Sequence, residues 1–163
     1  MIAALVNPVQ PFAEFATKDA LAAGRALGLQ IHLAQASSER DIDATFPTLL
    51  RLGAGGLVVC PDTFLLSRRG QLAALAIRHT MPTIFFVREF SAAGGLMSYG
   101  PSVTDGYHQV GIYAGRILKG ERPGDLPVQR SAKFSLVINL STAKVLGLDV
   151  PFYLQQLADE VIE

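Results

Sequence analysis

Short hydrophobic runs alternate with amphipathic stretches through the first 90 residues of the chain. Four of these runs carry little polar alternation, which is typical of strands covered on both faces; they span residues 2–6, 29–35, 56–60 and 83–87. The stretches between them have the spacing of helices. Alternating β and α units of this length predict an α/β fold, a parallel-sheet three-layer sandwich with right-handed crossovers and helices on both faces.

Three helices are predicted between the strands. The first spans residues 12–27, and its apolar positions recur at intervals of three and four, so we expect them to face the sheet: Phe12, Phe15, Ala16, Ala20, Ala23 and Leu27. The second carries Ile42, Phe46, Leu49 and Leu50, opens with a capping box of Ser38 and Asp41, and should kink or restart at Pro47. The third spans about 64–79 and ends before Pro82.

The regular alternation of predicted strands and helices ends after residue 87. A flexible stretch at residues 92–95 leads to a short strand at 96–99 and a long helix at about 103–119, which Gly120 closes. A Pro-rich connection at 121–127 follows, then a strand at 134–140 and short helices at 141–146 and 151–158. The long helix has the clearest apolar stripe in the chain: Val103, Tyr107, Val110, Ala114, Ile117 and Leu118.

Composition narrows the classes of function. Fourteen basic residues balance fourteen acidic ones and are scattered, so neither nucleic-acid binding nor a polybasic membrane patch is indicated. Cys60 is the only cysteine, which excludes an internal disulfide and predicts a buried thiol. No apolar run approaches the roughly 20 residues of a membrane span. The first residues lack the basic and apolar regions of a signal peptide, so we expect no export signal in this chain.

The motifs of cofactor-dependent and hydrolytic enzymes are absent. No Gly-rich turn joins the first strand to its helix, and there is no P-loop lysine motif or Gly-x-Ser-x-Gly elbow. The three histidines, His32, His79 and His108, do not have the spacing of metal ligands. We therefore predict no catalytic residue, no metal and no cofactor.

Polar and aromatic residues instead follow successive predicted strands. The carboxyl ends of the strands in an open α/β sheet form one edge, where ligands bind. We predict a ligand-binding rim there, made of Asn7, Gln10, Ser37, Ser38, Asp62, Phe64, Arg88, Glu89 and Phe90, with Tyr99 beyond them. Local structure is the competing explanation, because Asn7-Pro8 favours a turn, Ser38 a helix cap and Asp62 a helix start. Arg88 and Glu89 suit a zwitterionic or carboxylate solute, or form a solvated ion pair.

Several separated motifs resemble the ABC substrate-binding family of the type I periplasmic-binding superfamily. They are Asn7-Pro8, SSERDI at 37–42, REF at 88–90 with GGLMSYG at 94–100, and FSLVINLSTAK at 134–144. The resemblance covers the whole chain and implies two α/β lobes that close over a small solute. Residues 1–95 and 127–163 would form the second lobe, and the strand and helix of 96–126 would complete the first. The family's leader and most of its first lobe would then be missing from this chain.

The resemblance also implies a function. The chain would be the C-terminal part of a non-enzymatic solute-binding component that holds an amino-acid-like molecule, aromatic or otherwise apolar, and delivers it to an ABC permease. The full-length protein would be periplasmic or lipid-anchored outside the cytoplasm. Two alternatives stay open. A small α/β enzyme or receiver domain would use the same rim, although only Asp62 and Glu89 are acidic there. A ligand-sensing regulatory module would share the lobe but lacks an attached helix-turn-helix.

The stripe of the helix at 103–119 predicts an interaction between chains. The first-lobe elements that it would face are not in this sequence, and exposed apolar patches of several hundred Å² are unusual on a monomer. We therefore expect a homodimer through this helix, with the segment 96–120 exchanged across Gly94 and Gly95 as one form of it. The competing expectation is that the helix folds back on its own lobe.

Overall fold

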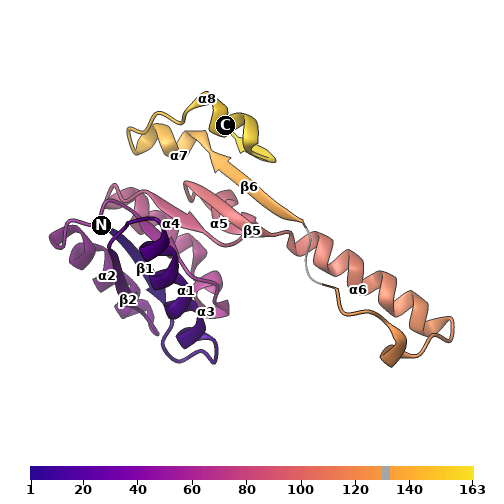
Figure 1. The fold of residues 1–163 in the computed structure, drawn as a ribbon. Helices are drawn as coiled ribbons and strands as arrows, with labels where there is room; N and C mark the ends of the chain where they lie inside the picture. The colour runs from indigo at the N-terminus through magenta and orange to yellow at the C-terminus, as the bar shows by residue number, and fades with distance from the viewer. Residues whose placement is uncertain (130–132) are drawn as a thin grey trace.

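A computed structural model describes residues 1–129 and 133–163, and its centre is one mostly parallel sheet of seven strands. Residues 130–132, part of the predicted second-lobe segment 127–163, lie outside the described residues. The strand order is β2-β1-β3-β4-β5-β6-β7, and only the β5–β6 pair is antiparallel. Figure 1 shows the fold as a ribbon, with the sheet and the helices around it. The strands are Ile2–Val6, Ile31–Gln35, Leu57–Val59, Thr83–Phe85, Met97–Pro101, Phe134–Asn139 and Glu160–Ile162.

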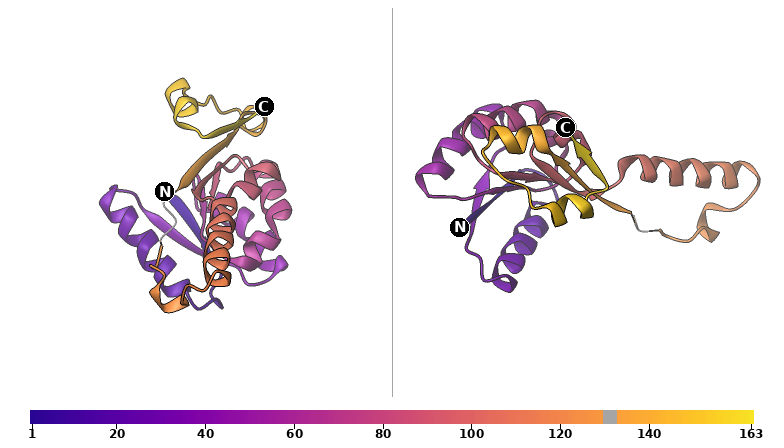
Figure 2. Two further views of the ribbon diagram at one scale, coloured as in Figure 1. Left: turned by 90° about the vertical axis from the view of Figure 1, so that its right-hand side faces the viewer. Right: turned by 90° about the horizontal axis from the view of Figure 1, so that it is seen from above.

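Helices cover both faces of the sheet, which confirms the predicted α/β sandwich. On one face, Ala3 and Leu5 of β1 share a core with α2 and α4, while on the other face Ala4 and Val6 pack against α1. The two further views of the ribbon separate these layers (Figure 2). The helices are α1 Ala13–Ala26, α2 Glu39–Arg51, α3 Thr63–Ser67, α4 Arg69–Arg78, α5 Arg88–Ala92, α6 Val103–Leu118, α7 Leu140–Val145 and α8 Phe152–Leu157, with a 3₁₀ turn at Pro123–Asp125.

The first helix forms where predicted but presents a different face to the sheet. Its contacts with the core are made by Ala13, Ala16 and Ala20, while Phe12 and Phe15 are 72% and 71% exposed. Leu27 is equally exposed. Small side chains allow α1 to lie close to the strands, so the larger apolar residues lie outside that contact. The prediction that Phe12, Phe15 and Leu27 face inward was wrong.

The second helix runs through Pro47 without restarting. Its predicted capping box is present: the Ser38 hydroxyl accepts from the Asp41 backbone N–H at 3.2 Å, and the Asp41 carboxylate accepts from the Ser38 N–H at 2.9 Å. Ile42, Phe46 and Leu49 are buried, as their spacing predicts, so packing holds the helix across the proline. The predicted third helix is broken at Arg68 into α3 and α4.

Two elements were not predicted. Residues 88–92, for which no helix or strand was predicted, form the short helix α5, and the last residues form the strand β7 beside β6. Close approaches also hold β5 and the turn before it against the end of β4. A Cβ on Gly100 would lie 1.8 Å from the Phe86 carbonyl oxygen, and one on Gly95 would lie 2.6 Å from the Phe85 ring. Gly95 is therefore packed tightly, whereas Gly94 has a φ of +98° that favours glycine.

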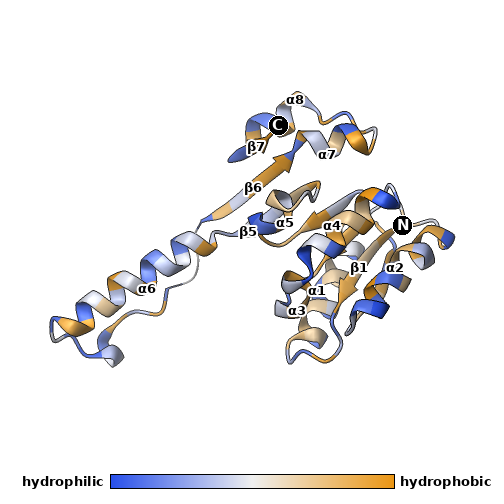
Figure 3. Cartoon of the chain, turned by 180° about the vertical axis from the view of Figure 1, so that it is seen from behind, coloured by the Kyte–Doolittle hydropathy of each residue, from blue (hydrophilic) through white to orange (hydrophobic). Residues whose placement is uncertain are grey.

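The long helix α6 projects from the body as an arm (Figure 1). None of its residues is buried, and the chain returns alongside it, where the Tyr113 hydroxyl donates to the Pro127 carbonyl at 2.6 Å. Hydrophobic residues recur along this arm although it lies apart from the sheet (Figure 3). Tyr107, Val110 and Leu118 are 75%, 65% and 88% exposed. The expectation that the helix folds back on its own lobe was wrong.

Candidate functional site

The carboxyl ends of β1 and β3 are joined by a buried polar pair. The Asn7 side-chain amide donates to Asp62 Oδ2 at 3.2 Å, and Asp62 Oδ1 accepts from the Leu65 backbone N–H at 2.8 Å. Asp62 therefore caps α3 and fastens it to the end of β1. Asn7 Oδ1 also accepts from the Val9 N–H at 3.2 Å, which shapes the turn after β1. Both side chains are satisfied locally, and both lie at the predicted edge.

Gln10 and Phe64 extend this corner of the rim. The Gln10 side-chain amide donates to the Pro61 carbonyl at 3.1 Å, which links the loops that follow β1 and β3. Phe64 packs partly into the main core, and the Arg68 guanidinium lies 5.8 Å from the centre of its ring. Arg68 also forms an ion pair of 2.7 Å with Glu39 at the start of α2. The contacts thus connect the loops after β1 and β3 with each other, and α3 with α2, at one edge of the sheet.

Ser37 and Ser38 lie at the end of β2 and serve the start of α2. Asp41 accepts from the Ser37 N–H at 2.9 Å and from the Ser37 hydroxyl at 3.1 Å, besides its bond with Ser38. These donors, the Ser37 backbone N–H first, lower the pKa of the exposed Asp41 carboxyl, because they stabilise its charged form. The helix cap therefore accounts for both serines.

Arg88 and Glu89 open α5 at the end of β4, beside a polar hollow of about 290 Å³. Arg88 Nε and Nη2 donate to the two carboxylate oxygens of Glu160 at 2.6 and 2.5 Å, a bidentate ion pair. Hydrogen bonding to Glu160 raises the pKa of Arg88, and the same bonds lower the pKa of Glu160. Gly100–Thr104, where the chain leaves the sheet, and Lys133, Ser135 and Val137, where it returns, also line this hollow.

Phe90 and Tyr99 do not join the others. Phe90 is fully buried, with its ring stacked 4.4 Å from that of Phe85, so it supports the rim from within the core and is not open to a ligand in this structure. Tyr99 is 57% exposed on β5, with its ring 5.7 Å from that of Phe134. Glu160 is the partner that sequence reasoning missed. Its strand is three residues long, and the ion pair spans 72 positions.

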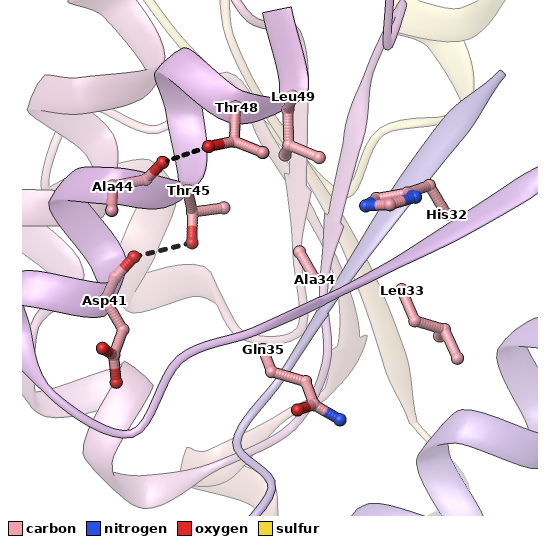
Figure 4. Close-up of a pocket in the computed structure, with 9 residues that line it drawn as sticks. All are labelled: His32, Leu33, Ala34, Gln35, Asp41, Ala44, Thr45, Thr48 and Leu49. Atoms are coloured by element: carbon pink, nitrogen blue, oxygen red, sulfur yellow. Dashed lines mark hydrogen bonds between the residues drawn. The ribbon is translucent and has the colours of Figure 1, made fainter. Parts of the chain in front are cut away.

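A second hollow lies along the edge strand β2, between it and α2 (Figure 4). Its volume is about 410 Å³, and His32, Gln35 and Asp41 contribute its polar groups. The nearby hydroxyls of Thr45 and Thr48 donate to backbone carbonyls of their own helix, at 2.7 and 2.9 Å. Figure 4 shows both bonds as dashed lines. With its hydroxyls engaged in this way, the hollow offers fewer convergent groups than the rim.

Within 1–129 and 133–163, no group of three or more His, Cys, Asp or Glu side chains could hold a metal ion. No helix in this part of the chain is long and apolar enough to cross a membrane. Burial raises the pKa of the Cys60 thiol to about 11, which favours an unreactive thiol.

Comparison with known proteins identifies the family of the chain. A family model described as ABC transporter substrate binding protein matches residues 2–162. The chain belongs to this family. The match confirms the resemblance drawn from the separated motifs. A comparison with curated protein sequences gives no match.

Solved structures share the fold of this ABC substrate-binding family member. They include a conserved domain protein from Vibrio cholerae (22% identity, TM-score 0.83), an ABC domain in complex with L-Trp from Streptococcus pneumonia (23%, 0.86) and a ligand-free, open substrate binding protein with adhesive properties from Clostridium difficile (19%, 0.73). These matches cover 98%, 99% and 99% of this chain but 54% of each solved chain. The chain thus spans about half the length of the structures it matches.

Proposed function

We propose that this chain is the second lobe of the solute-binding component of an ABC transport system. The observation that carries the proposal is the convergence of Asn7, Asp62 and Arg88 at one edge of the sheet, in a chain matched by the family over residues 2–162. Ligands of open α/β sheets bind at this edge. A binding role without catalysis, the small solute and the permease as partner follow from the family and belong to the proposal.

The proposed solute is amino-acid-like. The rim offers a carboxylate at Glu89 and a guanidinium at Arg88 after β4, and the buried amide of Asn7 and carboxylate of Asp62 after the neighbouring strands β1 and β3. Groups of both signs suit a zwitterion, and a guanidinium binds carboxylates in a bidentate manner, as Arg88 binds Glu160. The structural neighbour with L-Trp bound agrees with this class. Because Arg88 is already paired with Glu160, a solute carboxylate would share or replace that partner.

The two-lobed arrangement is part of the proposal. Residues 1–95 and 127–163 would form the second lobe, and the segment 96–126 would pack against the first. The projection of α6 and the 54% coverage of the solved chains support it. The complete protein would then be periplasmic or lipid-anchored outside the cytoplasm. A homodimer through α6 is proposed for the chain on its own, because six apolar residues of the helix have no cover.

Thermal-shift screening of amino acids tests the function, with this chain and with a two-lobed protein in which a first lobe precedes residue 1. We expect one or more amino acids to stabilise the two-lobed protein. Asp62→Ala and Arg88→Ala should each weaken its binding about 10-fold or more, since a lost buried partner costs about 1 to 3 kcal/mol. Arg78→Ala, in the last turn of α4, is the control. Unchanged affinity in both rim variants would reject the site, and no response to any solute would reject the function.

A further inference from the structure

The ion pair of Arg88 with Glu160 joins two elements that the lobe holds with unequal strength. Arg88 is the first residue of α5, and Phe90 anchors that helix, because its side chain is fully buried and its ring stacks on that of Phe85. Glu160 is the first residue of β7, a three-residue strand at the edge of the sheet in which no residue is buried. The guanidinium is therefore the fixed partner, and the carboxylate is the one that can move.

Solvent reaches both members of this pair. The side chains of Arg88 and Glu160 are 53% and 35% exposed, and exposed ion pairs contribute little to stability. Their geometry determines instead what the guanidinium recognises, since Nε and Nη2 donate to the two oxygens of a single carboxylate at 2.6 and 2.5 Å. Another carboxylate that accepts the same two bonds would replace Glu160 without disturbing the core of the lobe.

The hollow beside the pair gives an incoming carboxylate access to Arg88. Arg88 and Glu160 both line this hollow of about 290 Å³, together with residues 100–104 and Ser135. Glu89 lines it as well and carries the opposite charge to an ammonium group. An acid that bears an ammonium group would therefore meet a partner for each of its charges, at Arg88 and at Glu89, once Glu160 has moved away.

We propose that Glu160 is an internal competitor for the solute. Its carboxylate holds the Arg88 guanidinium until the carboxylate of a solute takes its place, and β7 then loses its link to α5. Glu160 thereby lowers the affinity of the site and favours solutes whose carboxylate can form both bonds. This inference rests on the proposed function and adds to it a residue that regulates the same site.

Acetate is the simplest probe, because it is a carboxylate without any other recognition group. The Arg88 Nε–H resonance of the ¹⁵N-labelled chain, identified by its loss in Arg88→Lys, reports the partner of the guanidinium. Glu160→Gln keeps the size of the side chain and removes its charge. We expect acetate to shift the Arg88 resonance saturably in this variant, at a concentration about 5-fold or more below that needed in the natural chain, because the apparent affinity falls with the fraction of the site that is free.

The ion pair of Arg116 with Glu121 is the matched control. It is also bidentate, and its side chains are 40% and 45% exposed, but it lies on the arm and its residues do not line the hollow. In Glu121→Gln, acetate should not bind saturably to Arg116. Equal responses of the two pairs to acetate would show only the general affinity of a guanidinium for carboxylates and would overturn the inference.

The direction of the effect in Glu160→Gln decides between competition and positioning. A weaker acetate response than in the natural chain would show that Glu160 positions Arg88, and an equal response would show that it has no influence; both overturn the inference. Glu160→Asp keeps the charge on a shorter side chain and should respond between the two, so it provides the comparison if Glu160→Gln does not fold. The proposed function is judged separately by the thermal-shift screen. Amino acids that stabilise the two-lobed protein equally with and without Glu160→Gln would leave the function standing and reject the competitor.

Discussion

At the residue scale, Asp62 connects the fold to the candidate site. One carboxylate oxygen caps α3 through the Leu65 N–H, and the other accepts from Asn7 at the end of β1. Both residues are buried, at 9% and 5% exposure. The pair therefore holds the two strand ends in the arrangement that a ligand would meet, and its loss should be measurable without any ligand.

We predict that Asp62→Ala lowers the free energy of unfolding by about 1 to 3 kcal/mol, because it removes a helix cap and leaves the Asn7 amide buried without a partner. Urea denaturation followed by circular dichroism measures this. Ser67→Ala is the matched control: its hydroxyl donates to the Phe64 carbonyl on the same helix but is exposed, so its effect should be smaller. Equal stability of the two variants would show that the Asn7–Asp62 pair does not stabilise this corner.

Asp41 predicts a pH dependence of stability. Its donors at Ser37 and Ser38 lower its pKa in the folded state, so the folded protein favours the charged carboxylate. The stabilisation is present above the unfolded pKa, about 3.9, and is lost as the pH falls through the lower folded value. Asp41→Asn should therefore melt below the natural protein at pH 7, and the difference should shrink below about pH 4. Melting curves at pH 7, 5, 4 and 3 measure it, and a constant difference would contradict the prediction.

The sequence predicted which residues lie at the strand ends, but it did not predict their contacts with residues far away in the chain. Asn7, Asp62 and the serines follow strands, and their position on the rim comes directly from a parallel sheet. The contact of Arg88 with Glu160 joins residues 72 positions apart, and no local pattern indicates it. The prediction placed Phe90 on the ligand-binding rim and Phe15 against the sheet, and both placements were wrong. The first is buried against Phe85 and the second is exposed, because the depth of a side chain depends on how closely two elements approach.

At the element scale, hydrophobic runs located strands and helices well, because a buried strand and an amphipathic helix each need a period that the sequence displays. β7 has three residues and borders only β6, so it carries no period of its own. α5 forms directly after the predicted strand 83–87, and its five residues are too few to show a helical repeat. Pro47 was expected to interrupt α2, but the buried Ile42, Phe46 and Leu49 on either side keep the helix continuous.

The approach of β5 to the strand end after β4 gives an element-scale prediction. A Cβ on Gly100 would lie 1.8 Å from the Phe86 carbonyl oxygen, so Gly100→Ala requires the backbone to move and should destabilise the lobe by about 1 to 3 kcal/mol or more. Gly70→Ala in α4 is the control, because no atom lies within 4 Å of its Cβ position. Alanine favours the helix by about 0.5 to 1 kcal/mol there. Urea midpoints that move in the same direction would contradict the assigned packing.

At the scale of the whole molecule, the chain is a compact lobe with an exposed arm (Figure 2). The sheet and its helices enclose a main core around Leu5 and Phe46, and a small C-terminal core surrounds Ile138, both made of the chain's own residues. The arm is held by its connection to β5 and by contacts with the returning segment, among them the ion pair of Arg116 with Glu121. The lobe can therefore be stable while the apolar stripe of α6 still lacks a cover. Because the stripe of α6 is separate from the core of the lobe, substitutions in the stripe can test the oligomeric state without disturbing the fold.

We predict that the chain alone associates through α6 and that light scattering at micromolar concentration gives twice the mass of one chain. Val110 lies in the middle of the stripe and is 65% exposed, so Val110→Asp places a charge where the partner would bury it and should restore the monomer mass. Gln109→Asp introduces the same charge about 100° around the helix, outside the stripe, and should leave the dimer intact. Because α6 buries no residue, neither substitution should change the unfolding of the lobe by more than about 0.5 kcal/mol. A monomer mass for the natural chain, unchanged by Val110→Asp, would reject the dimer and leave α6 as a surface for a first lobe.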